Sequence, residues 1–197
     1  MAPGGPPGPT PADEGLRGEG PRHRRQLGVD APGYLSHDVW SYDFTTARTR
    51  NSSPVRILNT VDEYTRMALG CRVAPWIGAR DVRRELEMLF RRHGKPRTIR
   101  SDNGREFVAA SLVSWLAEQG VACAFIEKGR PQQNAYVERF NGTMRDETLN
   151  GEEFNNVLEA RVVLEAWVEE YNERRPHRGP GMKTPRQFAA EWKKGTE

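Results

Sequence analysis

The chain has 197 residues, 36% of them hydrophobic, with a formal net charge of +3 and an isoelectric point of about 9.0. That is enough for one domain with a buried core. No apolar run approaches the ~20 residues of a membrane span, and the N-terminus lacks the apolar core of a signal peptide. Two separated cysteines, Cys71 and Cys123, make neither a disulfide framework nor a zinc knuckle. We therefore expect a cytoplasmic protein with reduced cysteines and no membrane partner.

The N-terminal segment, residues 1–33, has the composition of a disordered tail. Its first 20 residues are mostly Pro, Gly, Ala and Thr, which bury too little apolar surface to offset chain entropy. The basic run Arg22-His23-Arg24-Arg25 follows. This run suits either contact with DNA phosphates or a solvated tail.

Three strands are predicted next. Residues 38–45 form the first, and its aromatic side chains alternate along one face: Trp40, Tyr42 and Phe44. Residues 55–61 and 67–73 form two more, and the five residues between them suit a hairpin connection. Three strands with short links predict an antiparallel meander.

Helices and strands then alternate. An apolar stripe and a Gly94 stop signal predict a helix over residues 79–93. The further expected elements are a strand at 97–101, a helix at 111–119, a strand at 121–126, and helices at 132–148 and 154–172. This order predicts an α/β fold, a mixed five-stranded sheet flanked by helices in a ribonuclease-H-like arrangement. We expect a core over residues 34–172 and a basic segment over 173–197.

Three acidic residues are candidates for one site. Asp43 lies within the aromatic-rich first strand, Asp102 lies where the fourth strand gives way to a turn, and Glu138 lies on the helix at 132–148. Each has an ordinary alternative. Asp43 suits a half-exposed strand, Asp102 suits a turn cap, and Glu138 suits an exposed helix.

The helix that carries Glu138 has two distinct sides. Glu138 shares one face with Asn134, Asn141 and Arg145, whereas the apolar residues form the other side: Val137, Phe140 and Met144. This pattern allows Glu138 to face a site rather than the core. Three carboxylates could hold two Mg²⁺ ions roughly 3.5–4 Å apart, one activating a water or a 3′-hydroxyl and the other stabilising a leaving oxygen.

The sequence resembles a known family over residues 34–192. The stretches that carry the likeness are Val39-Trp40-Ser41-Tyr42-Asp43-Phe44, Ile99-Arg100-Ser101-Asp102-Asn103-Gly104, Gln133-Asn134-Ala135-Tyr136-Val137-Glu138-Arg139 and Tyr171-Asn172-Glu173-Arg174-Arg175-Pro176-His177. In these stretches the chain resembles the retroviral-integrase catalytic core, and more closely the bacterial insertion-sequence transposases encoded in two overlapping reading frames. The 35 residues between Asp102 and Glu138 also match the family's spacing.

The resemblance implies an activity, a cofactor and partners. It implies cleavage at transposon 3′ ends and strand transfer into target DNA, with Mg²⁺ or Mn²⁺ as cofactor, and Asp43, Asp102 and Glu138 as metal ligands. It implies double-stranded DNA as partner, a homo-oligomer on that DNA, and a DNA-binding protein encoded in the upstream frame. We find no end-recognising helix-turn-helix in the chain.

Charge placement suggests where DNA would lie. Residues 145–170 carry a local charge of −6 and residues 173–194 a local charge of +5. A basic tail would neutralise phosphates, or it could pair with the acidic helix. The DNA-binding candidates are Lys128, Arg130, Asn134, Asn141, Arg145, Arg174 and Arg175.

Two rival functions are open. A ribonuclease-H-like nuclease would take a further acidic ligand from the first helix, where Asp81 and Glu85 are available. A catalytically idle remnant would only bind DNA or a partner transposase, although all three carboxylates are present.

Overall fold

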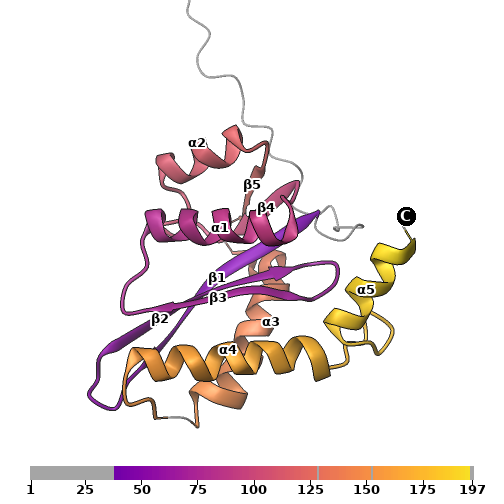
Figure 1. The fold of residues 1–197 in the computed structure, drawn as a ribbon. Coiled ribbons are helices and arrows are strands. Elements are labelled where there is room, and N and C mark those ends of the chain that lie inside the picture. Colours follow the sequence, from indigo (N-terminus) through magenta and orange to yellow (C-terminus); the bar gives the residue numbers. More distant parts are fainter. Residues whose placement is uncertain (1–37, 128, 152, 196–197) are drawn as a thin grey trace, which may run out of the picture.

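The computed structural model describes residues 38–127, 129–151 and 153–195 (Figure 1). The expected disordered tail, residues 1–33, and Lys128 lie outside the described residues. Within them, a single five-stranded sheet has the strand order β3-β2-β1-β4-β5. The strands are β1 Val39–Arg48, β2 Pro54–Asp62, β3 Ala68–Ala74, β4 Thr98–Ser101 and β5 Ala122–Phe125.

The sheet is mixed, as predicted. Strands β1, β2 and β3 pair antiparallel, which confirms the meander, whereas β4 runs parallel to both β1 and β5. A parallel pair needs a crossover connection, and helices α1 (Ala79–His93) and α2 (Ala110–Glu118) provide the two crossovers. Strand β1 therefore sits at the centre of the sheet, between the antiparallel and the parallel halves.

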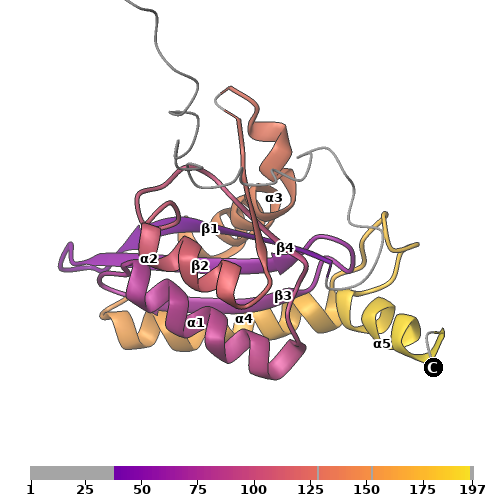
Figure 2. The same ribbon diagram turned by 90° about the horizontal axis from the view of Figure 1, so that it is seen from above.

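Helices α1 and α2 cover one face of the sheet (Figure 2). The alternation of β1 places Trp40 and Tyr42 on this face, where they are 0% and 1% exposed. They pack against the apolar stripe of α1, which includes Leu86 and Leu89, and against Trp115 of α2. The predicted aromatic face of β1 is therefore a core face.

Helices α3 (Ala135–Met144) and α4 (Val157–Arg174) cover the opposite face. Val137, Phe140 and Met144 of α3 are buried there, so the predicted apolar side of this helix is confirmed. Asp43 alternates with Tyr42 along β1, and its side chain thus lies on the face that α3 covers. This placement brings α3 to the first candidate carboxylate.

The predicted helix over 132–148 is divided into three parts. A 3-10 turn (Pro131–Asn134) precedes α3, and a π-helical turn (Arg145–Leu149) follows it. A proline at the start cannot donate a helical hydrogen bond, and wide π turns occur most often near functional sites. The helix that carries Glu138 is therefore shorter than expected.

The C-terminal segment packs on the core rather than extending from it. Helix α5 (Pro185–Gly195) contacts α4, and the Tyr64 ring packs against Phe188 in a tilted and Trp192 in an edge-to-face arrangement, with ring centroids 5.3 and 5.1 Å apart. Thr184 and Gln187 begin α5 with reciprocal side-chain-to-backbone hydrogen bonds of 3.1 and 3.3 Å. Thr-Pro-x-Gln is a helix-start signal, and α5 is a helix that was not predicted. Within the described residues, no helix is both long and apolar enough to cross a bilayer.

Candidate active site

Strand register brings the first two carboxylates side by side. Ser41 of β1 lies opposite Arg100 of β4 in a parallel ladder. Asp43 and Asp102 each lie two residues beyond this last paired position, and the charge of Asp102 acts on the Asp43 carboxyl. Neighbouring strands lie about 4.8 Å apart, and residues in register point to the same face. Asp102 directly follows β4, at the end of a parallel strand where ligands commonly bind.

Asp43 lies in a negative and partly desolvated environment. Burial is the main cause that raises the pKa of its carboxyl to about 6, and the charges of Asp102 and Glu138 raise it further. The Asn141 Nδ2 group donates a hydrogen bond of 2.9 Å to Asp43 Oδ2 and partly offsets this effect. A cation placed here would remove the repulsion, so an oxygen-ligated divalent ion suits the chemistry of these residues.

Glu138 lies in the first turn of α3 with an exposed side chain. Partial burial raises the pKa of its carboxyl. Its charge reaches Asp43, but among residues 38–127, 129–151 and 153–195 no three His, Cys, Asp or Glu side chains gather closely enough to hold one ion. The charges of Asp102 and Glu138 thus both act on the Asp43 carboxyl, and joint metal binding by all three is still a prediction.

Asp102 is held by the turn that follows it. Its Oδ1 atom accepts a 2.9 Å hydrogen bond from the Gly104 amide, so the turn-capping role that we considered is real. A Cβ atom on residue 104 would lie only 2.9 Å from the same oxygen. A glycine is therefore needed at position 104 for this turn to hold the carboxylate where it lies.

Two predicted DNA contacts are buried instead. Asn134 and Asn141 are 1% and 4% exposed, so neither side chain is available to DNA in this conformation. Asn141 bridges Asp43 and the fully buried Asn59, whose Nδ2 donates a 2.7 Å hydrogen bond to Asn141 Oδ1. Asn141 on the polar side of α3 thus packs on the sheet, whereas Glu138 and Arg145 on the same side are exposed, a division that the helical period alone did not show. Asn59 was missed because a lone polar residue in a strand gives no signal in the sequence.

A buried ion pair next to the site was also missed. Arg100 Nη1 donates hydrogen bonds of 3.0 and 2.9 Å to the two carboxylate oxygens of Glu63, and one of 3.3 Å to the Gln133 carbonyl. Ser41 Oγ donates to the same carboxylate. Arg100 thereby connects β4, two residues before Asp102, to the segment that leads into α3. Burial raises the pKa of Glu63 in spite of the hydrogen bond from Ser41 and the charge of Arg100.

The remaining basic candidates do not gather at the carboxylates. Arg145 donates a 2.9 Å hydrogen bond to Thr45 Oγ1 on β1, close to Asp43 along the strand. The others pair with acidic side chains: Arg130 with Glu127, Arg174 with Glu170 and Arg175 with Glu147. The C-terminal bases therefore pair with acids of the preceding segment, as in the alternative that we weighed. Whether any of them contacts DNA is still a prediction.

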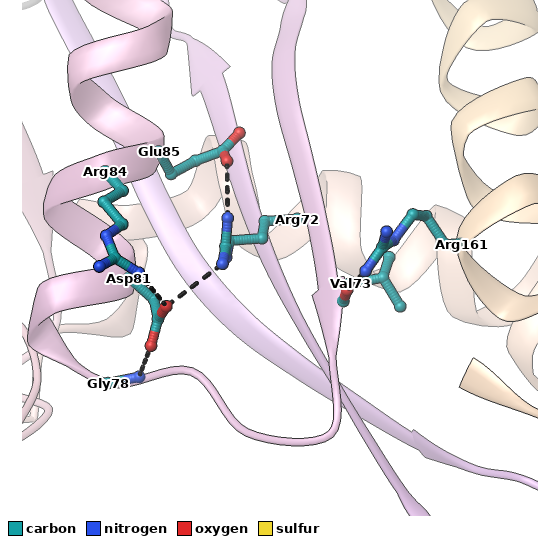
Figure 3. Close-up of polar contacts among 7 residues, drawn as sticks. All are labelled: Arg72, Val73, Gly78, Asp81, Arg84, Glu85 and Arg161. Atoms are coloured by element: carbon teal, nitrogen blue, oxygen red, sulfur yellow. Dashed lines mark hydrogen bonds and ion pairs between the residues drawn. The ribbon is translucent and has the colours of Figure 1, made fainter. Parts of the chain in front are cut away.

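The acidic residues that a ribonuclease-H-like nuclease would need lie elsewhere. Figure 3 shows Asp81 and Glu85 of α1 reaching Arg72 of β3, at 3.2 and 3.8 Å. Strand β3 is at the far edge of the sheet from β4. On its other side, Arg161 of α4 donates a 3.1 Å hydrogen bond to the Val73 carbonyl. These acids therefore hold an edge strand to a helix and do not join Asp43.

Comparison with known proteins places this arrangement in a family. Two family models, both described as integrase core domain, match residues 34–131 and residues 119–185. An uncharacterized 31.7 kDa protein of insertion element IS407 from Burkholderia multivorans is 40% identical over 85% of this chain and 59% of its own length. The transposase for insertion sequence element IS904 from Lactococcus lactis is 28% identical over 76% of this chain and 60% of its own length. The chain thus spans about three fifths of these curated relatives.

A solved structure supports the fold. The HTLV-2 integrase catalytic core domain in complex with magnesium superposes with a TM-score of 0.63 at 18% identity, covering 79% of this chain and 98% of that one. At this identity the likeness concerns the fold, and it confirms the ribonuclease-H-like sheet predicted from the order of elements. With integrase core matches that together span residues 34–185, this chain belongs to the integrase core domain family, whose relatives here include proteins of bacterial insertion elements.

Proposed function

We propose that this chain is the catalytic core of a transposase that cleaves DNA at transposon 3′ ends and transfers those ends into target DNA. The observation that carries the proposal is the parallel register of β1 and β4, whose last paired residues, Ser41 and Arg100, lie two positions before Asp43 and Asp102. The charge of Glu138 acts on the same carboxyl. Membership of the integrase core family supports this reading.

Asp43, Asp102 and Glu138 would hold Mg²⁺ or Mn²⁺, with two ions bound at full occupancy. When bound, the metal supplies an activated oxygen nucleophile and stabilises charge on the leaving oxygen. The donor set fits hard cations because it consists of carboxylate oxygens, and the pKa of Asp43 is raised by burial and further by the charges of Asp102 and Glu138. Glu138 is exposed at the start of α3 and would complete the set by turning toward Asp43.

The neighbouring side chains of this chain orient the carboxylates. The hydrogen bond from Asn141 fixes one oxygen of Asp43, and Asn59 fixes Asn141 in turn. The Gly104 amide fixes one oxygen of Asp102. Such supports keep ligands in place before the reaction begins, which is how outer hydrogen bonds tune metal sites.

The proposed partners follow from the same reading. The substrate is double-stranded DNA, namely transposon ends and target, and Arg130, Arg145, Arg174, Arg175 and Lys128 are proposed to contact it. We further propose that the protein acts in the cytoplasm as a homo-oligomer on DNA, together with a DNA-binding protein from the upstream reading frame. Phosphate contacts by arginine would make the binding salt-dependent.

The decisive experiment measures nicking of a labelled duplex that bears a transposon end, with purified protein and Mn²⁺ or Mg²⁺. Asp43→Asn, Asp102→Asn and Glu138→Gln should each lower the rate by about 100-fold or more, because each removes a proposed ligand. Glu118→Gln, an exposed acid at the end of α2, is the matched control and should retain wild-type activity.

Two outcomes separate the rivals. Nicking that survives in Glu138→Gln but is lost in Glu85→Gln would replace the proposal with a nuclease of the ribonuclease H type. DNA binding without nicking, even after the upstream-frame protein is added to permit assembly, would support an idle remnant.

A further inference from the structure

A cavity of about 640 Å³ lies on the flank of α3, beside the segment that follows α4. Helix α3 contributes Tyr136, Arg139 and Thr143 to it, and the end of α4 contributes Tyr171. Its lining includes four arginines and no acidic side chain: Arg66, Arg139, Arg175 and Arg178. Such a concentration of one charge in a hollow attracts the opposite charge.

The arginines converge from three separate parts of the chain. Arg66 comes from the β2–β3 turn, where its backbone has a φ of 65°, and its guanidinium stacks 3.7 Å from the centroid of the Tyr136 ring. Arg139 comes from α3, and Arg175 and Arg178 follow α4. Within the described part of the chain, Arg175 pairs with Glu147, whereas no carboxylate pairs with Arg66, Arg139 or Arg178. Arg139 and Arg178 thus have no paired carboxylate among these residues, whereas the charge of Arg66 acts on the buried Glu63 carboxylate.

His177 lines the same cavity and is affected by the positive charge of these arginines. Burial lowers the pKa of its imidazole, and the charges of Arg175, Arg66 and Arg139 lower it further. Its Nε2 atom and Arg66 Nη1 are buried without a hydrogen-bond partner among the described residues. Buried polar groups normally find partners, so the cavity has donor capacity that the protein itself does not use.

Phosphate fits this chemistry better than a carboxylate-bearing peptide because of where the cavity lies. Arg139 directly follows Glu138, so the cavity and the candidate active site flank the same helix. Arginine guanidinium groups bind phosphate oxygens through paired N–H donors. A DNA strand whose reacting phosphate meets the carboxylates must pass other phosphates along the flanks of α3.

We propose that this cavity, the α3 arginine pocket, binds a backbone phosphate of the DNA strand held at the active site. The inference rests on the proposed function, since it takes DNA as the substrate. Arg139 and Arg178 are the contacts in this proposal because both side chains are exposed and lack a paired carboxylate among the described residues. Arg66 and Tyr136 form the wall that places them.

The test is DNA binding by the full chain in EDTA, so that catalysis plays no part. Fluorescence anisotropy with a labelled duplex is measured over a range of salt concentrations for Arg139→Ala/Arg178→Ala. Affinity should fall roughly tenfold, as for the loss of a charged hydrogen bond, and the slope of log affinity against log salt should become shallower by about 1. The matched control is Arg80→Ala/Arg91→Ala, which removes two exposed arginines of α1 on the opposite sheet face.

A scan with single methylphosphonates, which make one phosphate neutral, locates the contact. One position should weaken binding by wild type and by the control but leave the Arg139→Ala/Arg178→Ala protein unaffected. Equal losses in both double variants would overturn the proposal. So would a pocket variant that loses thermal stabilisation by inorganic phosphate yet binds DNA like wild type, because the ligand would then be a free anion. Failure of nicking in metal-containing assays, with these binding results intact, would instead count against the proposed function.

Discussion

The Glu63–Arg100 ion pair is the buried interaction whose disruption we expect to cost the fold most. The two side chains are 2% and 8% exposed and share two hydrogen bonds. Arg100→Met keeps the apolar stem but leaves the carboxylate of Glu63 with Ser41 as its remaining described donor. Removing one partner of a buried pair costs about 3–5 kcal/mol. Against a total stability of about 5–15 kcal/mol for a domain, this loss is large.

A matched double variant also removes the negative charge of Glu63 that Arg100→Met leaves without its partner. In Glu63→Gln/Arg100→Met, the glutamine oxygen can still accept the hydrogen bond from Ser41, so most of the lost stability should return, to within about 2 kcal/mol of wild type. Urea unfolding followed by circular dichroism at neutral pH measures all three proteins. Glu63→Gln alone completes the double-mutant cycle.

The pH dependence of Arg100→Met has a definite sign. Burial raises the pKa of folded Glu63, and losing Arg100 removes a charge that lowers it. The folded state then binds a proton more tightly than the unfolded state, so stability falls as pH rises from the unfolded pKa through the folded one. The deficit should be full at neutral pH and shrink in acid. A loss below about 1 kcal/mol, or a double variant no more stable than Arg100→Met, would refute the reasoning.

Three further predictions concern the site and its surroundings. Asp43→Asn should raise the free energy of unfolding at pH 7 in EDTA by about 1–3 kcal/mol, because the pKa of about 6 makes ionised Asp43 unfavourable there. A difference between variant and wild type that is the same at pH 7 and at pH 4 would contradict this prediction. Gly104→Ala should lower the nicking rate by about tenfold through displacement of Asp102, with little change in urea unfolding; wild-type turnover would show that the turn does not matter. Arg72→Met should destabilise the fold by about 1–3 kcal/mol, because it leaves the buried Glu85 carboxylate without its ion pair to Arg72. Nicking by the folded protein should be unchanged, and a loss of nicking would indicate that Glu85 takes part in the active site.

Local patterns predicted the elements because their causes are local. The alternation of Trp40, Tyr42 and Phe44 indicated which face of β1 enters the core, and the apolar stripe of α1 matched its observed bounds. The turn signal at Asp102-Asn103-Gly104 placed Asp102 at the end of a strand, and that strand pairs parallel with β1. Period and turn chemistry depend on neighbours a few residues away, so one sequence is enough to read them.

The helix of Glu138 shows where such patterns fail. Asn134 and Asn141 were predicted to contact DNA, but both are buried, and Asn141 is hydrogen-bonded to Asn59 of β2. A helical period distinguishes polar from apolar faces, yet it does not tell whether a polar face meets solvent or a buried polar partner such as Asn59. Similarly, the acidic and basic C-terminal stretches were evident, whereas their pairing depended on how α5 folds back on α4.

The sequence by itself determined the order of strands and helices as far as α4, the core face of β1 and the positions of the candidate carboxylates, because these follow from short-range periodicity and spacing. Only the tertiary structure decided that Arg100 pairs with Glu63, that Asn59 supports Asn141, and that four arginines share one cavity. These contacts join residues tens of positions apart. Sheet register and helix packing create them, and neither leaves a local signature in the chain.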